Sequence, residues 1–206
     1  LHAIFTIVVN FAENQRDMIL PIVAYGDPVL RRVADDIDAD YPELEKLIEN
    51  MWETMYNAEG VGLAAPQIGK SIRLFLVDAT PFAEDEPALK DFKKVFINAE
   101  IIEEEGDEWA FSEGCLSIPQ IREDVDRQET IKIRYQDENF VEYEEEYSGL
   151  AARVIQHEYD HIEGVLFTDK LSGMRKRLLS KKLGKISKGE IRASYKMRFP
   201  AAKKRR

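Results

Sequence analysis

Apolar residues recur at two different spacings along this chain, and each spacing predicts a kind of secondary structure. One group recurs at intervals of three and four residues, which places its members on one face of a helix. The members of this group are Leu44, Leu47, Ile48, Met51 and Met55. Asp40 followed by Glu43 resembles a capping box, so we predict a helix over residues 42–57 whose apolar stripe faces the core.

Two further helices and several strands follow from the same reasoning. Residues 149–163 have helical spacing and precede Gly164, a residue suited to ending a helix. We predict that a basic C-terminal helix begins with residues 171–186. The segments with strand character are residues 72–78, 95–104, 130–136 and 139–147, the last two forming a hairpin. We expect a loop at residues 80–94 and an acidic turn at residues 103–108. Strands followed by helices, without regular alternation, favour an α+β fold.

Length and composition indicate one domain with appendages. The chain has 206 residues, 44% of them hydrophobic, which is enough for an ordinary core. No apolar run approaches the length of a membrane span, so no membrane partner is expected. A single cysteine excludes an internal disulfide and favours a reducing, cytoplasmic location.

The charge of the chain is distributed unevenly. Residues 174–206 hold 14 Lys and Arg and one acidic residue, a balance of +13, although the whole chain carries −10. This basic end either contacts an anionic partner such as RNA or is a solvated helix with a disordered end. Residues 1–17 are atypical: residues 3–9 are apolar but lack a basic flank, so they make a poor signal peptide. We interpret residues 1–17 as an extension upstream of the domain.

The strongest chemical signal is an H-E-x-x-H motif formed by His157, Glu158 and His161. Residues four apart lie on one face of a helix, so both imidazoles can bind one divalent metal. Glu158 follows the first histidine, where its carboxylate can take a proton from a water on the metal. Two solvated histidines on a helix face are the alternative, but the helical context favours a metal site.

A third ligand is needed, and Cys115 is the candidate. It lies in the segment E-G-C-L-S, residues 113–117. A lone cysteine is usually a small buried hydrophobic residue, but an H-E-x-x-H motif in the same chain reverses that preference. One thiolate and two imidazoles leave a tetrahedral position open, as catalytic sites require. A third segment, G-V-G-L-A-A-P-Q-I-G at residues 60–69, is on its own most simply a connection between a helix and a strand.

Together these segments resemble the three signature motifs of the peptide deformylase family, G-x-G-L-A-A-P-Q, E-G-C-L-S and Q-H-E-x-D-H, in the same order and with similar spacing. The resemblance runs from about Met18 to about Leu183. It implies mostly antiparallel sheets packed around a central metal-binding helix, with a C-terminal helix. We therefore divide the chain into an atypical extension (residues 1–17), a catalytic domain (residues 18–173) and a basic helix and tail (residues 174–206).

The resemblance also implies an activity and its residues. The expected reaction is metal-dependent hydrolysis that removes the N-formyl group from the N-terminal formylmethionine of new polypeptides and releases formate. By resemblance, the metal ligands are Cys115, His157 and His161. The catalytic residues are Glu158 as general base, with the side-chain amide of Gln67 and the backbone N–H of Leu116 as donors to the oxyanion. Fe²⁺ is the expected metal, and Zn²⁺, Ni²⁺ or Co²⁺ can replace it in purified material.

The methionine side chain of the substrate needs an apolar pocket. The residues that we expect to contact the substrate are Val61, Gly62, Phe111, Gly114, Arg122, Leu150 and Val154. Arg122 is equally well explained as a surface arginine. Arg153 departs from the family, because many relatives have an apolar residue there. We predict that its aliphatic stem lines the pocket while its guanidinium reaches water.

The expected partners are N-formylmethionyl nascent peptides and, through the basic segment at residues 175–185, ribosomal RNA. We expect residues 188–206 to be dispensable for activity on a short peptide. Two alternatives remain open. One is a zinc peptidase with Glu163 or Asp169 as third ligand, which leaves Cys115 without a role. The other is a ribosome- or RNA-associated binding protein without enzymatic activity.

Overall fold

The computed structural model describes residues 18–200. The prediction for residues 1–17, and the part of the predicted tail at residues 201–206, lie outside the described residues. The described chain contains a five-stranded antiparallel sheet with the order β2–β3–β4–β5–β6 and a two-stranded parallel sheet of β1 and β7. The strands are β1 (Ile22–Val23), β2 (Gly62–Ala64), β3 (Leu74–Asp78), β4 (Lys93–Cys115), β5 (Ile118–Gln136), β6 (Glu142–Ser148) and β7 (Met197–Arg198). The predicted α+β class is confirmed.

The described residues also include three α-helices and five short 3₁₀ helices. The α-helices are α1 (Leu44–Asn57), α2 (Gly149–Ile162) and α3 (Gly173–Ser187). The 3₁₀ helices are η1 (Pro28–Arg31), η2 (Ala65–Ile68), η3 (Thr80–Phe82), η4 (Pro87–Leu89) and η5 (Phe167–Asp169). None of these helices has the length and apolar content that a membrane span needs.

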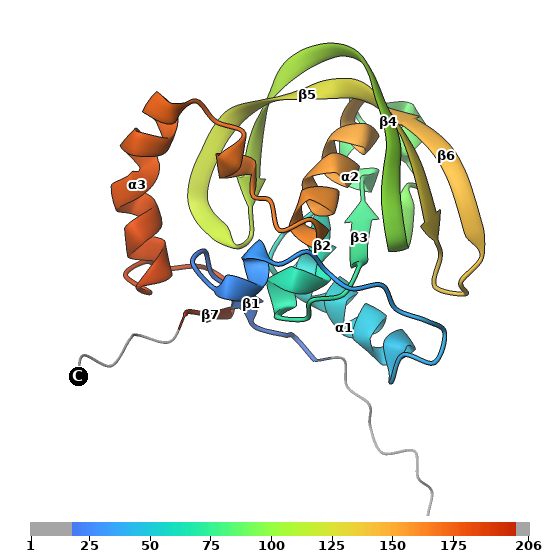
Figure 1. The fold of residues 1–206 in the computed structure, drawn as a ribbon, viewed down its shortest axis with the longest axis horizontal. Helices are drawn as coiled ribbons and strands as arrows, with labels where there is room; N and C mark the ends of the chain where they lie inside the picture. Colours follow the sequence, from blue (N-terminus) through green and yellow to red (C-terminus); the bar gives the residue numbers. More distant parts are fainter. Residues whose placement is uncertain (1–17, 201–206) are drawn as a thin grey trace, which may run out of the picture.

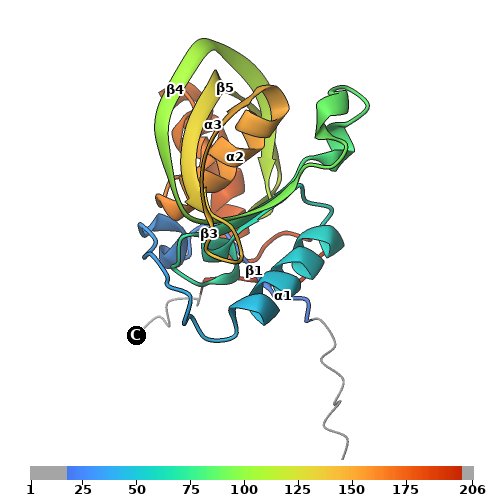
Figure 2. The same ribbon diagram turned by 90° about the vertical axis from the view of Figure 1, so that its right-hand side faces the viewer.

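The large sheet wraps around α2, as Figure 1 shows, and α1 covers the other side of its β2–β3 end (Figure 2). Successive residues of a strand point to opposite faces, and β3 divides its side chains in this way. Phe75 and Val77 belong to the hydrophobic cluster that includes α2, whereas Leu74 and Leu76 belong to the cluster that includes α1. All of β3 is buried because both faces are covered. This packing makes α2 the central helix of the domain.

Helix α1 was predicted correctly in kind, but its start was wrong. It begins at Leu44, and Glu43 has a left-handed backbone (φ 54°) without a side-chain cap. The predicted capping box is absent because Asp38 organises the preceding turn. The Asp38 carboxylate accepts a hydrogen bond from the backbone N–H of Asp40 at 3.1 Å, and the Asp38 carbonyl accepts one from Tyr41 at 3.1 Å.

The predicted acidic turn at residues 103–108 was also wrong. Strand β4 runs through it without a break and stays paired with β5. Glu103 lies opposite Lys132, and two register shifts, between Ile101 and Glu103 and between Glu105 and Glu108, absorb the extra residues. Gly106 has φ 86° within the second shift. The glutamates are exposed, so their charges remain hydrated within the strand.

The predicted hairpin is confirmed as β5 and β6, but β5 starts twelve residues earlier than predicted, at Ile118.

Helix α2 ends where the sequence predicted, before Gly164 with φ 71°. A side chain at Gly164 would also meet the backbone of Arg31, because a Cβ there would lie 2.8 Å from the Arg31 carbonyl carbon. Helix α3 begins at Gly173, with the Ser172 hydroxyl accepting a bond from the N–H of Arg175 at 3.4 Å.

The chain after α3 does not form the separate tail that we expected. It returns to the domain, and β7 pairs with β1 beside the start of the described chain (Figure 1). Residues 188–200 therefore contact the catalytic domain, which argues against the expectation that residues 188–206 are dispensable.

Candidate metal centre and catalytic cavity

Cys115, His157 and His161 come together at one point. Cys115 is the last residue of β4, and both histidines project from α2, one turn apart. Their ligand atoms all lie within 4.8 Å of one another, and Cys115 Sγ is 3.3 Å from His161 Nε2. The cluster is a soft thiolate with two imidazoles, which suits Zn²⁺, Fe²⁺, Co²⁺ or Ni²⁺ rather than Mg²⁺ or Ca²⁺. The predicted ligand set is thus assembled by the fold.

Glu113 orients the first histidine. Its carboxylate oxygen Oε2 lies 2.9 Å from His157 Nδ1, so Nδ1–H donates to the carboxylate and Nε2 is left for a metal. Glu113 was not assigned a role from the sequence. The available signal was its position in the E-G-C-L-S segment, two residues before Cys115.

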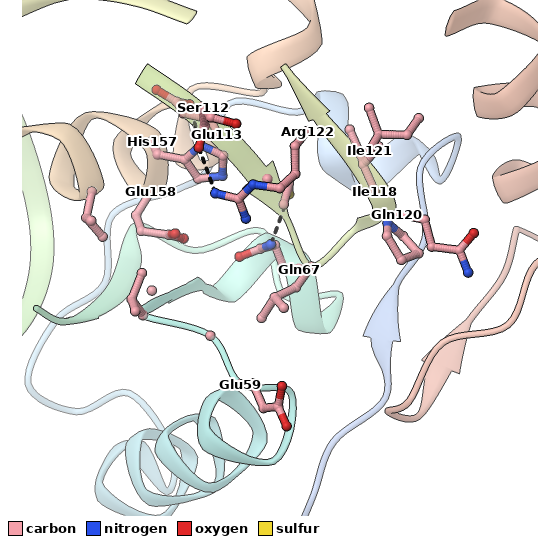
Figure 3. Close-up of a pocket in the computed structure, with 18 of the residues that line it drawn as sticks. Glu59, Gln67, Ser112, Glu113, Ile118, Gln120, Ile121, Arg122, His157 and Glu158 are labelled. Carbon is pink, nitrogen blue, oxygen red and sulfur yellow. Dashed lines mark hydrogen bonds and ion pairs between the residues drawn. The ribbon is translucent and has the colours of Figure 1, made fainter. Parts of the chain in front are cut away.

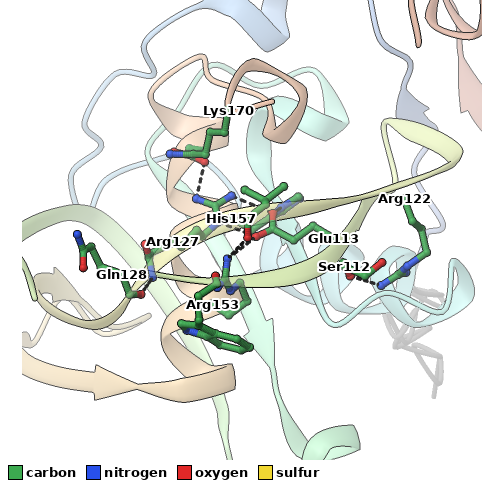
Figure 4. Close-up of polar contacts among 12 residues, drawn as sticks. Ser112, Glu113, Arg122, Arg127, Gln128, Arg153, His157 and Lys170 are labelled. Atoms are coloured by element: carbon green, nitrogen blue, oxygen red, sulfur yellow. Dashed lines mark hydrogen bonds and ion pairs between the residues drawn. The ribbon is translucent and has the colours of Figure 1, made fainter. Parts of the chain in front are cut away.

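Glu113 is itself held by two buried arginines (Figure 4). Arg127 Nε and Nη2 donate to the two oxygens of Glu113 at 2.7 and 3.0 Å, and Arg153 Nη1 donates at 3.2 Å. Arg127 Nη1 also donates to Asp160 at 2.7 Å. Burial alone would raise the pKa of Glu113, but the hydrogen bonds from His157 and Arg127 outweigh burial and lower it well below its usual range. The carboxylate therefore stays ionised between two buried arginines, one of which also pairs with Asp160, a neighbour of Lys170 at 3.4 Å.

Arg153 corrects one prediction. It borders the cavity, but its guanidinium does not reach water, since only 2% of the residue is exposed. The guanidinium donates to the backbone carbonyls of Val125 and Trp109 at 2.9 and 2.6 Å, and lies 4.3 Å from the centre of the Trp109 ring. The prediction failed because the β4–β5 hairpin closes over this side of α2 and supplies these acceptors.

The two histidines differ in their electrostatic surroundings. Burial lowers the pKa of His161 well below its usual value, and the positive charges of His157 and Arg127 lower it further. For His157, burial also acts to lower the pKa, but its hydrogen bonds to Cys115 and Glu113 outweigh burial and raise it well above the usual value. Metal binding requires both imidazoles to be neutral, so a proton on His157 would have to leave when the metal binds.

Glu158 lies at the same cavity, and 4% of the residue is exposed. Its Oε2 atom has no hydrogen-bond partner within residues 18–200, although a buried polar oxygen normally has one. Burial raises the pKa of Glu158 to about 7. Gly62 is needed here, because a Cβ at that position would lie 2.4 Å from Glu158 Oε1. The carboxylate is thus pressed against the backbone, next to the ligand cluster.

Gln67 faces the cluster from η2. Its Oε1 accepts the backbone N–H of Ala64 at 2.8 Å, which fixes the orientation of the amide. The amide nitrogen then points to Cys115 Sγ and Ser117 Oγ, each at 3.5 Å. Figure 3 shows Gln67, His157 and Glu158 directed toward one cavity.

This cavity has a volume of about 670 Å³. Most of the predicted substrate contacts line it, namely Val61, Gly62, Phe111, Gly114, Arg122 and Val154, together with Leu116. Leu150 does not line it; this residue is buried in the hydrophobic cluster around α2. Arg122 donates to the carbonyl of Ser112 at 2.7 Å and crosses close to Gly114. The sequence reasoning missed one wall, which residues 192–195 form.

The carboxylates required by the peptidase alternative are engaged elsewhere. Glu163 accepts a hydrogen bond from Arg73 at 2.6 Å. Asp169 pairs with Arg31 and caps the backbone N–H of Leu166 at 2.8 Å. Neither belongs to the ligand cluster of the described chain, whereas Cys115 does. The geometry therefore favours cysteine as the third ligand.

Comparison with known proteins points to one family. The family model for polypeptide deformylase matches residues 19–177. The peptide deformylase of Christiangramia forsetii is 66% identical over 196 residues, which cover 92% of this chain and all of that protein; that of Flavobacterium johnsoniae is 61% identical with the same coverage. The crystal structure of a peptide deformylase from Legionella pneumophila superposes with a TM-score of 0.74 at 37% identity, over 84% of this chain and 98% of that one. Residues after 177 lie beyond the family model.

Proposed function

The chain belongs to the polypeptide deformylase family and removes the N-formyl group from nascent peptides, and we propose how its own residues carry out that reaction. The observation that carries the proposal is the convergence of Cys115, His157 and His161 within 4.8 Å, beside the unpaired carboxylate oxygen of Glu158. A cavity of about 670 Å³ opens onto this point and can admit the first residues of a peptide.

The three ligands would hold one divalent ion, and we propose Fe²⁺ as the native metal. The donor set also suits Zn²⁺, Ni²⁺ and Co²⁺, so purified protein can carry any of them. When bound, such an ion polarises the formyl oxygen and lowers the pKa of water. Glu113 keeps His157 in the tautomer that presents Nε2, and the Glu113 charge makes that imidazole a better ligand.

Glu158 is the general base in this proposal. With a pKa raised to about 7 by burial, it is poised to exchange protons near neutral pH. It would accept a proton from the attacking water and deliver it to the departing amine as the C–N bond breaks, leaving formate and a free amino terminus. Gly62 keeps room for its carboxylate.

Gln67 and Leu116 are the proposed oxyanion donors. The carbonyl oxygen of Gln67 is occupied by Ala64 N–H, so its NH₂ group is the part available to the substrate. The backbone N–H of Leu116 follows Cys115 directly, at the same wall of the cavity. Donors fixed in advance stabilise negative charge on the formyl oxygen without reorganising during the reaction.

Substrate selection is assigned to the apolar wall of the cavity. Val61, Phe111 and Val154 form that wall, which suits an unbranched methionine side chain. We include Gly114 and Arg122 as contacts to the peptide backbone, and Leu150 as support for Val154 from one turn earlier on α2. A cytoplasmic location is consistent with a reduced Cys115 as ligand.

We also propose that α3 contacts ribosomal RNA. Part of its positive charge holds the helix to the domain: Arg175 bonds Glu123 at 2.8 Å, and Lys176 bonds the carbonyl of Asp169 at 2.7 Å. Arg177, Lys181 and Lys185 make no side-chain hydrogen bond or ion pair within residues 18–200, which leaves them available to phosphates.

The decisive experiment is formate release from an N-formylmethionyl tripeptide by protein loaded anaerobically with Fe²⁺. The parent should release formate, whereas Cys115→Ala should bind much less metal and lose activity together with it. A peptidase would instead cleave internal amides, and a binding protein would do neither. Full metal content and full activity in Cys115→Ala would refute the ligand assignment.

A further inference from the structure

The chain that follows α3 forms part of the active-site wall. We call residues 188–200 the C-terminal segment; it lies beyond the residues that the family model matches. Its β7 portion is tied to β1 by two backbone hydrogen bonds, Ile22 N–H to the Lys196 carbonyl at 2.9 Å and Ala24 N–H to the Arg198 carbonyl at 2.8 Å. The Gln120 side chain donates to the Arg192 carbonyl at 2.7 Å. The segment is therefore fixed at both ends of the stretch that faces the cavity.

Within this segment, Tyr195 reaches the turn that joins β4 to β5. Its hydroxyl donates a hydrogen bond of 2.7 Å to the carbonyl of Leu116. The next carbonyl of the same turn, that of Ser117, accepts the backbone N–H of Tyr25 at 2.9 Å, and Tyr25 follows the strand to which β7 is paired. Two adjacent carbonyls of the turn are thus held by the C-terminal segment and by its partner strand.

The position of this turn matters because it carries Leu116 between the ligand Cys115 and the strand β5. The Leu116 side chain packs against Gly60, where an added Cβ would lie 2.9 Å from Leu116 Cδ1. Gly60 and Tyr195 therefore contact Leu116 at different parts of the residue, its side chain and its carbonyl. The Tyr195 hydrogen bond holds the peptide plane that joins Leu116 to Ser117, whereas the N–H of Leu116 lies in the preceding plane, which joins Cys115 to Leu116. Because the carbonyl and the side chain of Leu116 are both held, rotation about its Cα is restricted, and this restricts the direction of its N–H.

We propose that Tyr195 is a positioning residue of the oxyanion site, which it serves by fixing the turn that presents the N–H of Leu116. The inference rests on the proposed role of Leu116 in the deformylase reaction. Tyr195 does not touch the reacting atoms. Tyr195 acts through the backbone of Leu116. The C-terminal segment, held against β1, places Tyr195 next to this backbone.

The test is Tyr195→Phe, which removes one hydroxyl and keeps the ring. Loss of one hydrogen bond that aims a donor should lower kcat roughly 3- to 10-fold, less than the ~10²-fold cost of losing an oxyanion donor itself. KM for an N-formylmethionyl tripeptide, metal content and Tm should stay close to the parent, because the cavity wall and the ligands remain. A purely structural role would instead lower Tm and raise KM along with the loss of kcat.

Tyr143→Phe is the matched control. Its hydroxyl contacts Asp137 at 3.4 Å in the β5–β6 hairpin, away from the cavity, so kcat should be unchanged. Deleting residues 189–206 should lower kcat at least as far as Tyr195→Phe does. An active parent whose Tyr195→Phe variant keeps kcat within twofold would overturn the inference. An inactive parent would instead count against the proposed function.

Discussion

Glu113→Gln is the substitution for which the structure gives the clearest magnitude. Glutamine keeps the size of Glu113 but loses its charge, and its NH₂ group must face a donor, either Arg127 or His157. The two buried arginines, Arg127 and Arg153, would lose the one buried carboxylate that both of them contact. Only Asp160 would remain as an anionic partner of Arg127, and Asp160 also pairs with Lys170 at 3.4 Å. Arg153 would then keep only carbonyl acceptors and the face of Trp109.

Breaking a buried ion pair by removing one partner costs about 3–5 kcal/mol. For a domain of this size, each kcal/mol corresponds to roughly 2–4 °C in Tm, so the variant should melt about 6–20 °C lower than the parent. His157 Nδ1 would then face either the glutamine NH₂ group or an uncharged amide oxygen in place of a carboxylate, and loss of such a partner typically weakens metal affinity by about 10- to 100-fold. Both effects arise from one carboxylate.

The assays are thermal unfolding of the metal-loaded protein and competition for the metal with a chelator of known affinity. Glu144→Gln is the control, because Glu144 also bonds two basic side chains, Lys132 at 2.7 Å and Arg134 at 3.0 Å, but on the exposed strand β6. It should leave Tm and metal affinity nearly unchanged. If Glu113→Gln behaves like this control, the buried network does not support the metal site, and the reasoning from its geometry is refuted.

Three other substitutions separate the roles in the proposed mechanism. Glu158→Ala should retain the metal but lose at least about 10²-fold in turnover, as measured by elemental analysis and formate release; normal activity would mean that another group takes the proton. Gln67→Ala should lower kcat more than it raises KM, because its hydrogen bond strengthens as the oxyanion forms, and a change in KM alone would leave Gln67 only a substrate contact. Replacing Arg177, Lys181 and Lys185 with Gln should weaken co-sedimentation with ribosomes and reduce the salt dependence of that co-sedimentation. Activity on a short peptide should be unchanged. Equal, salt-independent pelleting of parent and variant would rule out the α3 contact.

Much of the metal centre could be predicted from the sequence because it depends on local geometry. The spacing of His157 and His161 acts within a single helix, and the helical pattern around them is strong. The same holds for helix α1 and for the β5–β6 hairpin, whose patterns cover only neighbouring residues. Local spacing alone could not predict that Cys115 is a ligand, because its distance from α2 depends on how the whole sheet folds. The resemblance to a known family supplied this prediction.

The contacts that could not be predicted depend on the register of distant strands. Arg127 meets Glu113 because β5 begins as early as Ile118 and pairs with β4 as far as Trp109, which lies opposite Arg127. Likewise, the guanidinium of Arg153 turns inward because carbonyls of both strands lie within its reach. The return of the C-terminal segment was missed for another reason: its basic composition indicated a solvated tail, and the two-residue strand β7 is too short to give a periodic pattern.

The ligand cluster has a further consequence for the chain as a polymer. Cys115 and His161 are 46 residues apart in the sequence, so an ion bound between them closes a loop of that length. A covalent link across such a loop would stabilise the fold by about 4 kcal/mol through the entropy of the unfolded chain. A metal that stays bound acts in the same way, as a cross-link between the end of β4 and the helix α2. Oxidation of Cys115 would then remove a metal ligand and also open this loop. The same damage to one sulfur atom would therefore inactivate the protein and lower its free energy of unfolding.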